Sequence, residues 1–202
     1  RLMGWMTRSW IRKADGVVFI GARMGEHTRL RYGEPARHGV MVTGAKIDEF
    51  RAAQAQVPST CEALDRWIGS RLLITYIGNL GLVHDWSTLA DAMPALLGRL
   101  GGLDRGVAIV VAASGPGVER LRSAWSDLDP EAVRFLDPLD DPSWGYLQGR
   151  SEISIVTLSL SAAEVSVPSK LFSALAAGSA IVAVAPGRSD AAEIVRLDDV
   201  GV

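Results

Sequence analysis

Short apolar runs and longer amphipathic stretches alternate along most of this chain. Five runs rich in Val, Ile, Leu and Ala have the length of buried strands, at residues 72–77, 107–112, 133–136, 153–160 and 181–185. Apolar residues that recur three or four positions apart predict helices at residues 86–100, 118–126, 142–148, 168–177 and 190–196. The regular alternation predicts an α/β fold, a Rossmann-like parallel sheet with helices on both faces.

The first part of the chain repeats this alternation in a shorter form. Its pattern predicts helices at residues 1–13 and 21–32, strands at 17–20 and 39–43, and a turn-like exit at 44–50. Residues 51–59, rich in Ala and Gln, are the best linker candidate, and residues 62–68 predict a short helix. We therefore expect three parts: the end of one domain at 1–57, a linker at 58–71, and a second domain at 72–202 that is truncated at its C-terminus.

Composition narrows the function classes. Of the 202 residues, 48% are hydrophobic and 22% are charged, and the net charge of −2 gives no general attraction for nucleic acid. Cys61 is the only cysteine, which excludes a disulfide framework, and His27, His38 and His84 lack metal-ligand spacing. No apolar run reaches the roughly 18 residues that a membrane span needs. We expect a cytoplasmic protein.

The N-terminal end carries Trp5 and Trp10 beside several basic residues. A segment of this kind can lie on a membrane surface. Because amphipathic helix ends more often pack inside a fold, we expect the two indoles to be buried.

In the stretch EVSVPSKLFSALAAG, the charge of Lys170 is unfavourable at its position. Pro168 and Ser169 start a helix there, and Gly178 ends it. Lys170 lies in the first turn, where a cation is disfavoured by about 0.3–1 kcal/mol. A bound phosphate would reverse that sign, because helix N-termini attract anions. The alternative is a lysine that lays its stem on the surface and keeps its ammonium in water, and the spacing alone leaves both open.

The loop GNLG after the strand at 72–77 is a second candidate. Gly78 and Gly81 let the backbone approach a ligand, Asn79 adds an amide, and His84 adds a group able to donate to an anion. The alternative is a tight turn with Asp85 as the cap of the next helix.

The strand-to-helix loops of a parallel sheet emerge on one edge, so the GNLG loop and the Lys170 loop can meet there. Together they would form a two-sided anion cradle. Glu164 and Ser166 precede Lys170 in its loop. The carboxylate of Glu164 is able to hold sugar hydroxyls, and an exposed loop carboxylate is the alternative.

The sequence SGPG at residues 114–117 imitates part of a dinucleotide-binding fingerprint. It follows a strand, opens a helix and precedes Asp137 at the end of the next strand. The third glycine position, however, holds Arg120, which is too bulky for close helix–strand packing. A Rossmann-type NAD(P)-binding oxidoreductase is therefore an alternative function.

Taken together, four stretches from Leu72 onward resemble the nucleotide-binding half of GT-B glycosyltransferases, in particular family 4 (glycosyl transferases group 1), which are retaining enzymes. They are LLITYIGNLGLVHDWSTLADAMPALL, VAIVVAASGPGVERLR, VRFLDPLD and EVSVPSKLFSALAAGSAIVAVAP. PSKLFSALAAG beside GNLG is the most specific part, and it is closest to members that build capsular or exopolysaccharides. Residues 12–50 resemble, more loosely, the end of the family's N-terminal domain, where the acceptor is recognised.

The resemblance implies a site for a UDP- or GDP-sugar, with no metal and no other cofactor. The implied catalytic residues are Lys170 and Glu164. The loop at 78–81 would lie against the pyrophosphate, and the segment from Arg134 to Leu139 would border the nucleobase. The implied donor-binding residues are Gly78, Asn79, Gly81, His84, Arg134, Leu139, Ser166, Ser169 and Ser173.

Two departures from the family's pattern bear on this site. Ser173 stands where the family usually has a Glu that binds the ribose hydroxyls, and a serine is shorter and uncharged. Val83, His84 and Asp85 stand where many members carry an Arg and a Lys. The first departure predicts weaker binding of the ribose. The second predicts either that Lys170 and His84 take on more of the phosphate binding or that the activity is weak.

The leading hypothesis is a glycosyltransferase of the hexosyltransferase type, in polysaccharide or glycoconjugate synthesis, with a glycan or lipid-linked acceptor. A peripheral contact of the full-length protein with the inner face of the cell membrane is left open. Because most of the family's N-terminal domain has no counterpart in this sequence, we expect a fragment that can bind a nucleotide without transferring a sugar. A degenerate, non-catalytic GT-B-like domain is the remaining alternative.

Overall fold

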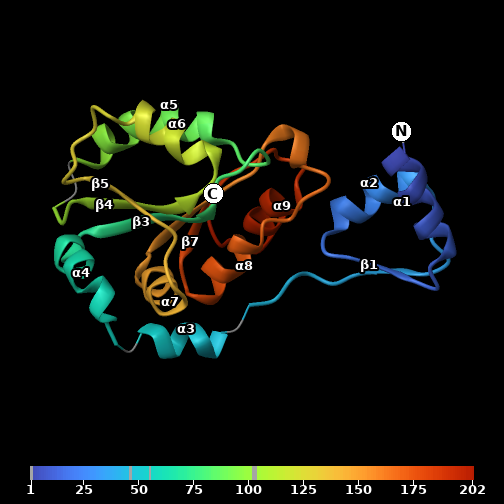
Figure 1. Cartoon of the computed structure of the whole chain (residues 1–202), viewed down its shortest axis with the longest axis horizontal. Helices are drawn as coiled ribbons and strands as arrows, with labels where there is room; N and C mark the ends of the chain where they lie inside the picture. Colours follow the sequence, from blue (N-terminus) through green and yellow to red (C-terminus); the bar gives the residue numbers. More distant parts are fainter. Residues whose placement is uncertain (1, 46, 55, 102–103) are drawn as a thin grey trace.

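A parallel sheet of five strands, in the order β5-β4-β3-β6-β7, forms the centre of the computed structural model (Figure 1). The structure describes residues 2–45, 47–54, 56–101 and 104–202. The strands are β3 (Leu72–Asn79), β4 (Val107–Ser114), β5 (Val133–Leu136), β6 (Ile153–Thr157) and β7 (Ala180–Val184). Each corresponds to one of the apolar runs, so the predicted α/β class with a Rossmann-like parallel sheet is confirmed.

The direction in which the chain adds strands to the sheet reverses between β3 and β6. From β3 the chain moves outward through β4 to β5, and then returns to add β6 and β7 on the other side of β3. β3 pairs with β6 only through Ile74 with Ile153 and Thr75 with Ser154, whereas it pairs with β4 as far as Asn79. Toward their carboxyl ends β3 and β6 are therefore not paired with each other, and ligands of open α/β sheets bind at such a switch point.

Helices cover both faces of this sheet (Figure 1). α5 (Trp86–Leu100) and α6 (Pro116–Ala124) lie on one face, and α4 (Glu62–Ile68) and α7 (Asp141–Arg150) lie on the other. α8 (Ser169–Ala176) and α9 (Asp190–Leu197) pack against β6 and β7. Side-chain alternation along β3 explains the two faces, because Ile74 and Tyr76 belong to the α5–α6 layer and Leu73 and Ile77 to the α4–α7 layer.

Residues 2–40 form a smaller unit beside the main sheet (Figure 1). It contains α1 (Leu2–Lys13), β1 (Val17–Phe19), α2 (Ala22–Tyr32) and β2 (His38–Val40), and β1 pairs with β2 in parallel. Arg1, the first residue of the predicted helix, lies outside the described residues.

The expectation that Trp5 and Trp10 are buried is wrong, because their side chains are 68% and 62% exposed. Ile11 marks the buried side of α1, and helical geometry places the two indoles about 100–120° away from it. Across the described residues, no helix combines the length and the apolar character that a membrane crossing requires.

The segment between the two units contains a helix that the sequence pattern does not predict. The pattern predicts a turn at 44–50 and a linker at 51–59, but α3 (Ile47–Gln54) spans part of both. Phe50 accounts for the helix, because its ring is buried 5.0 Å from the ring of Trp144 on α7. The 3-10 helix η1 (Ser59–Cys61) then leads into α4. Lys46 and Ala55 lie outside the described residues, and the domain boundaries 1–57, 58–71 and 72–202 stay predictions.

α2 docks on the main part of the chain through its first turn. The Asp190 carboxylate, at the start of α9, accepts hydrogen bonds from the backbone N–H groups of Arg23 (2.9 Å) and Met24 (3.1 Å). N–H groups in a first helical turn have no partner in their own helix, so Asp190 caps α2 from a distant part of the sequence. Gly21 permits this approach, because a Cβ there would lie 2.3 Å from Asp190. The Arg23 guanidinium adds a 2.9 Å ion pair with Glu193.

Several strands end at residues other than those expected, and β3 and β6 matter most for the site. β6 ends at Thr157 instead of residue 160, because Leu160–Ala162 forms the 3-10 helix η2. β3 runs two residues beyond its predicted end, so Gly78 and Asn79 pair with β4 and are not in a free loop. The backbone of these two residues is therefore held by the sheet.

The SGPG loop packs against the end of β3. The backbone N–H of Gly117 donates to the Leu80 carbonyl oxygen (3.0 Å). Gly115 has a φ of +105°, and a Cβ there would lie 2.5 Å from the Asn79 amide oxygen. The Arg120 side chain covers the ring of Trp86. The glycines allow two loops to pack closely, and nothing in this loop favours the oxidoreductase alternative.

Gly115→Ala should lower the free energy of unfolding by roughly 2–4 kcal/mol, through backbone strain and overpacking against Asn79 and Leu80. Urea unfolding followed by circular dichroism measures the change. Gly98→Ala in α5 is the matched control, because a Cβ at Gly98 meets nothing within 4 Å. The control should gain about 0.5–1 kcal/mol from helix propensity. Equal stability of the two variants would contradict the packing role of Gly115.

Candidate anion-binding site

A cavity of about 350 Å³ opens at the carboxyl ends of β3 and β6, where the sheet changes direction. The end of β3, the segment before α8, the first turns of α8 and one side of α7 form its wall. Seven of the predicted site residues line it: Gly78, Asn79, His84, Ser166, Ser169, Lys170 and Ser173. The expected meeting of the GNLG loop with the Lys170 loop is therefore found in the structure.

Lys170 reaches from the first turn of α8 to the end of β3. Its ammonium donates to the Tyr76 hydroxyl (2.6 Å) and to the Asn79 carbonyl oxygen (2.8 Å), and it lies 4.3 Å from the centre of the Tyr76 ring. The side chain thus turns inward and not into water. Desolvation by burial lowers the pKa of Lys170 from 10.5 to about 7. An anion bound in the cavity would favour the charged form again.

The end of β3 is shaped to receive this lysine. Gly78 has a φ of +110°, a region that L side chains avoid, and a Cβ there would lie 3.9 Å from Cε of Lys170. The Tyr76 hydroxyl donates to the Asn79 carbonyl oxygen (2.9 Å), so this carbonyl accepts from two side chains. Burial raises the pKa of Tyr76, so the phenol stays protonated and keeps donating.

His84 lies beside Lys170 and is fixed by one ring nitrogen. Its Nδ1 lies 2.7 Å from the Thr157 carbonyl oxygen, which can only accept, so Nδ1 carries the proton. Desolvation, and then the charge of Lys170, lower the pKa of His84, and the hydrogen bond to Thr157 opposes them. A neutral His84 therefore offers Nε2 as an acceptor. This differs from the expectation that it donates to an anion, and it suits a ligand hydroxyl.

The three serines of the predicted site surround the start of α8. No side chain caps this helix, whose N-cap is Pro168. Ser166 precedes the helix, Ser169 begins it, and Ser173 lies one turn further along the same cavity wall. Uncapped N–H groups at the mouth of a cavity are suited to bind an anion, and Lys170 supplies a positive charge at the same place.

A smaller cavity of about 180 Å³ shares Ile77, Gly78, Asn79 and Trp144 with the first. Leu139 lines it, as does the neighbouring Pro138. The residues that line this smaller cavity include no charged side chain, whereas the first cavity holds Lys170. The two cavities together suit an elongated ligand with an anionic part at Lys170 and a flat apolar part near Leu139.

Three predicted site residues lie outside both cavities. The Glu164 carboxylate lies within hydrogen-bond distance of Nδ1 of His27 on α2, at 2.9 Å. The guanidinium of Arg134 lies 4.3 Å from the ring centre of Trp67. Gly81 closes the turn after β3, where its carbonyl oxygen accepts from the backbone N–H of His84 (3.1 Å). Direct roles for these three in the cavity stay predictions.

The sequence pattern misses several residues of the site. Tyr76, Trp144 and Gln148 are not among the predicted site residues, yet Tyr76 accepts a hydrogen bond from Lys170 and the other two line its cavity. The hydroxyl of a buried tyrosine needs a hydrogen-bond partner, and this is the one signal that could have drawn attention to Tyr76.

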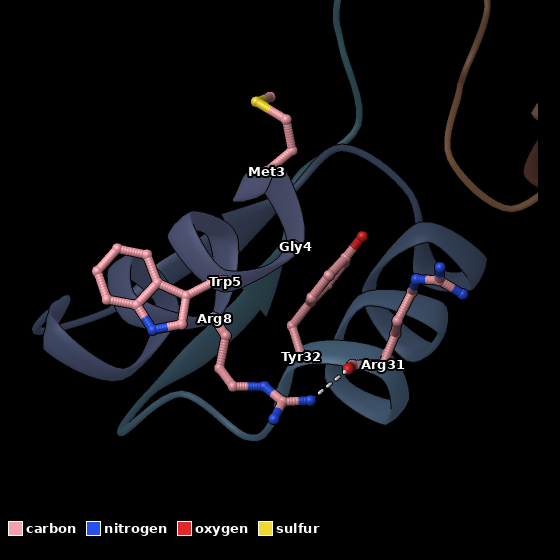
Figure 2. A pocket seen from close by; sticks show the side chains of 6 residues that line it. All are labelled: Met3, Gly4, Trp5, Arg8, Arg31 and Tyr32. Atoms are coloured by element: carbon pink, nitrogen blue, oxygen red, sulfur yellow. Dashed lines mark hydrogen bonds between the residues drawn. The ribbon is translucent and has the colours of Figure 1, made fainter. Parts of the chain in front are cut away.

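A larger cavity, of about 670 Å³, lies on the N-terminal unit between α1 and α2 (Figure 2). Met3, Trp5, Arg8, Arg31 and Tyr32 line it, and the Arg8 guanidinium donates to the Arg31 carbonyl oxygen (3.2 Å). In Figure 2, Trp5 points away from the space between Tyr32 and Arg31. None of the predicted site residues lies here, so size alone does not locate the functional site.

No group of three or more His, Cys, Asp or Glu side chains in the described ranges could hold a metal ion. The metal independence expected from the sequence stays a prediction. Any charge that develops on a ligand at this site would be balanced by Lys170 and the backbone N–H groups near it.

No protein-family model matches the chain, and no curated protein matches it either. Solved structures do match. A glycosyltransferase from Rickettsia africae superposes with a TM-score of 0.70 over 100% of this chain and 52% of its own, at 15% sequence identity. HepE of Anabaena, in complex with UDP and glucose, gives a TM-score of 0.65 over 89% of this chain and 47% of its own, at 17% identity. Sucrose-phosphate synthase of Thermosynechococcus elongatus gives a TM-score of 0.62 over 92% of this chain and 45% of its own, at 15% sequence identity.

This chain has the fold of about half of a GT-B protein. The resemblance to GT-B glycosyltransferases is thereby confirmed at the level of the fold. The chain spans about half the length of these three structures, at 52%, 47% and 45% of them. In this GT-B chain, the cavity of Lys170 lies at the switch point of the larger sheet.

The buried position of Lys170 should make the stability of this GT-B chain depend on pH. The folded pKa is about 7 and the ordinary value 10.5, so the unfolded chain binds more protons between these values, and stability rises with pH. Lys170→Met removes the effect. We expect the wild-type free energy of unfolding, relative to Lys170→Met, to rise by about 2–4 kcal/mol from near pH 7 to near pH 10.

Urea unfolding at several pH values measures this difference. Lys13→Met, which removes an exposed lysine of α1, is the control and should follow the wild type. A difference between wild type and Lys170→Met that stays constant with pH would show that Lys170 keeps its ordinary pKa.

Proposed function

We propose that this GT-B chain binds a nucleoside diphosphate sugar, with its pyrophosphate at Lys170 and the end of β3. The observation that carries the proposal is the ammonium of Lys170, held by Tyr76 and the Asn79 carbonyl beside the uncapped start of α8. Such a partly desolvated cation in a cavity gains from an anionic ligand that restores its charge. HepE, a similar fold, has been solved with UDP and with UDP-glucose, which supports the same class of ligand here.

The arrangement suits the chemistry of sugar transfer. When the bond between the sugar and the diphosphate breaks, its electrons pass to the leaving phosphate oxygen. Backbone N–H groups and a lysine can stabilise that charge without a metal. We propose a retaining hexosyltransferase of family 4, acting in polysaccharide or glycoconjugate synthesis when the chain is part of a longer protein. The glycan or lipid-linked acceptor, the cytoplasmic location and a contact with the membrane stay predictions.

The other cavity residues are assigned by their chemistry. His84 offers an acceptor nitrogen beside Lys170, which suits a hydroxyl of the donor sugar. Leu139 and Pro138 line the smaller cavity, which suits the nucleobase through backbone and apolar contacts. Ser173 lies in the wall of the larger cavity and suits the ribose.

Calorimetric titration with UDP and with GDP, without added metal, tests the proposal. One of the two should bind, and Lys170→Met should weaken it by about tenfold or more, because a hydrogen bond to a charged group is lost. In the wild type, affinity should fall as the pH rises above about 7, because protons must then be taken up by Lys170 on binding. The affinity of Lys170→Met should lack this dependence.

Lys13→Met is the matched control and should bind as the wild type does. Unchanged affinity in Lys170→Met would refute the phosphate assignment. If neither UDP nor GDP binds, the degenerate, non-catalytic alternative is favoured.

Ser173 offers a test of the ribose position. Ser173→Glu places a carboxylate where two ribose hydroxyls would lie, and it should tighten nucleotide binding by about three- to tenfold, because charged hydrogen bonds are stronger than neutral ones. Titration with UDP and with inorganic diphosphate distinguishes the cause. Only UDP should gain affinity, and an equal change for both ligands would contradict the ribose assignment.

A further inference from the structure

The half-buried nitrogen of Lys170 has only neutral partners. Its hydrogen bonds go to the Tyr76 hydroxyl (2.6 Å) and to the Asn79 carbonyl oxygen (2.8 Å). Within the part of the chain that the structure describes, no Asp or Glu forms an ion pair with it. A cation that is taken out of water without a carboxylate partner is disfavoured. The surroundings of Lys170 therefore favour its neutral form when no ligand is bound.

A neutral amine in this position is a nucleophile. The nitrogen of a lysine has three positions besides its carbon, and at Lys170 two of them hold hydrogens that donate to Tyr76 and Asn79. In the neutral amine the third position is a lone pair. Because burial lowers the pKa of Lys170 to about 7, about half of the molecules carry this lone pair at neutral pH. An ordinary lysine is almost wholly charged there, and desolvation is one way in which proteins activate a lysine.

The same cavity offers a place for a phosphate group beside this amine. Lys170, Ser166 and Ser169 line one space of about 350 Å³. The backbone N–H groups in the first turn of α8 have no side-chain cap, and such groups bind anions. Serine hydroxyls can also donate to phosphate oxygens. A small molecule whose phosphate lies at the start of α8 can therefore present a neighbouring carbon atom to Lys170.

We propose that Lys170 is a site of covalent acylation by acyl phosphates. The lone pair of its Nζ attacks the carbonyl carbon and forms a C–N bond, while the C–O bond to the phosphate breaks with its electron pair. Inorganic phosphate leaves at the start of α8 and takes up the proton that the amine loses, so no further reactant is needed. The product is a neutral amide. The acylation itself goes beyond the proposed function, whereas its consequence, the loss of nucleotide binding, rests on that function.

Acetyl phosphate tests the proposal on the whole chain. The sequence has three lysines, Lys13, Lys46 and Lys170, so peptide mass spectrometry can follow each of them separately. At pH 7, Lys170 should be acetylated about tenfold or more faster than Lys13, an exposed lysine of α1. The rate at Lys170 should level off above about pH 8, whereas an ordinary lysine gains reactivity up to about pH 10. Equal rates at Lys170 and Lys13 would overturn the proposal.

A reagent without phosphate separates the nucleophile from the phosphate site. p-Nitrophenyl acetate delivers the same acetyl group from a neutral ester. The preference for Lys170 over Lys13 should therefore be about threefold or more greater with acetyl phosphate than with the ester. An equal preference with both reagents would show a reactive lysine without a phosphate site, and would overturn the assignment to acyl phosphates.

Calorimetric titration with UDP measures the consequence for the donor site. The fraction of molecules that binds UDP should fall as Lys170 becomes acetylated, because the positive charge is lost. Lys13→Met is the control and should lose binding to the same extent as the wild type. If UDP does not bind the untreated chain, the donor site is overturned and the rates of acetylation still decide the present proposal. Normal UDP binding by the acetylated chain would overturn the expected block of the site.

Discussion

The candidate anion-binding site depends on the loss of pairing between β3 and β6. The two strands pair only at the level of Thr75 and Ser154, where buried hydroxyls satisfy one another: Thr75 lies 2.8 Å from Ser151, and Gln148 donates to Ser154 at 3.0 Å. Polar groups buried with partners cost little. Beyond this level, the strands leave a space that a side chain from α8 can enter. Lys170 enters it, and its charge then depends on what else is bound there.

The sequence predicts the fold better than it predicts the connections between elements. Apolar runs and amphipathic stretches show local periodicity, and this is why all five strands of the main sheet could be found. α3 could not be found in this way, because Ala and Gln also suit a linker, and its apolar anchor Phe50 packs on Trp144, which is far along the chain. The prediction that Trp5 and Trp10 are buried failed for a related reason, since no local pattern shows which side of a helix will have a neighbour.

The residues of the site could be predicted, or were missed, for the same reasons. Gly78, Asn79 and Lys170 could be placed together because loops at the carboxyl edge of a parallel sheet must lie near one another. Tyr76 reads as a core position of a strand, and only its hydroxyl distinguishes it. Glu164 lies in the expected segment, but its partner His27 belongs to the other unit, and a contact between units leaves no trace in local spacing.

The capping of α2 by Asp190 has a mechanical consequence. The contacts recorded between α2 and α9 are hydrogen bonds and an ion pair, and water can replace each of them when the surfaces separate. A junction held by such contacts can open and close without exposing a large apolar area. Gly21 sets how tightly it closes, because its missing side chain lets the carboxylate reach the helix. The placement of α2 against the main part of the chain then depends on these polar contacts and on the contact between His27 and Glu164.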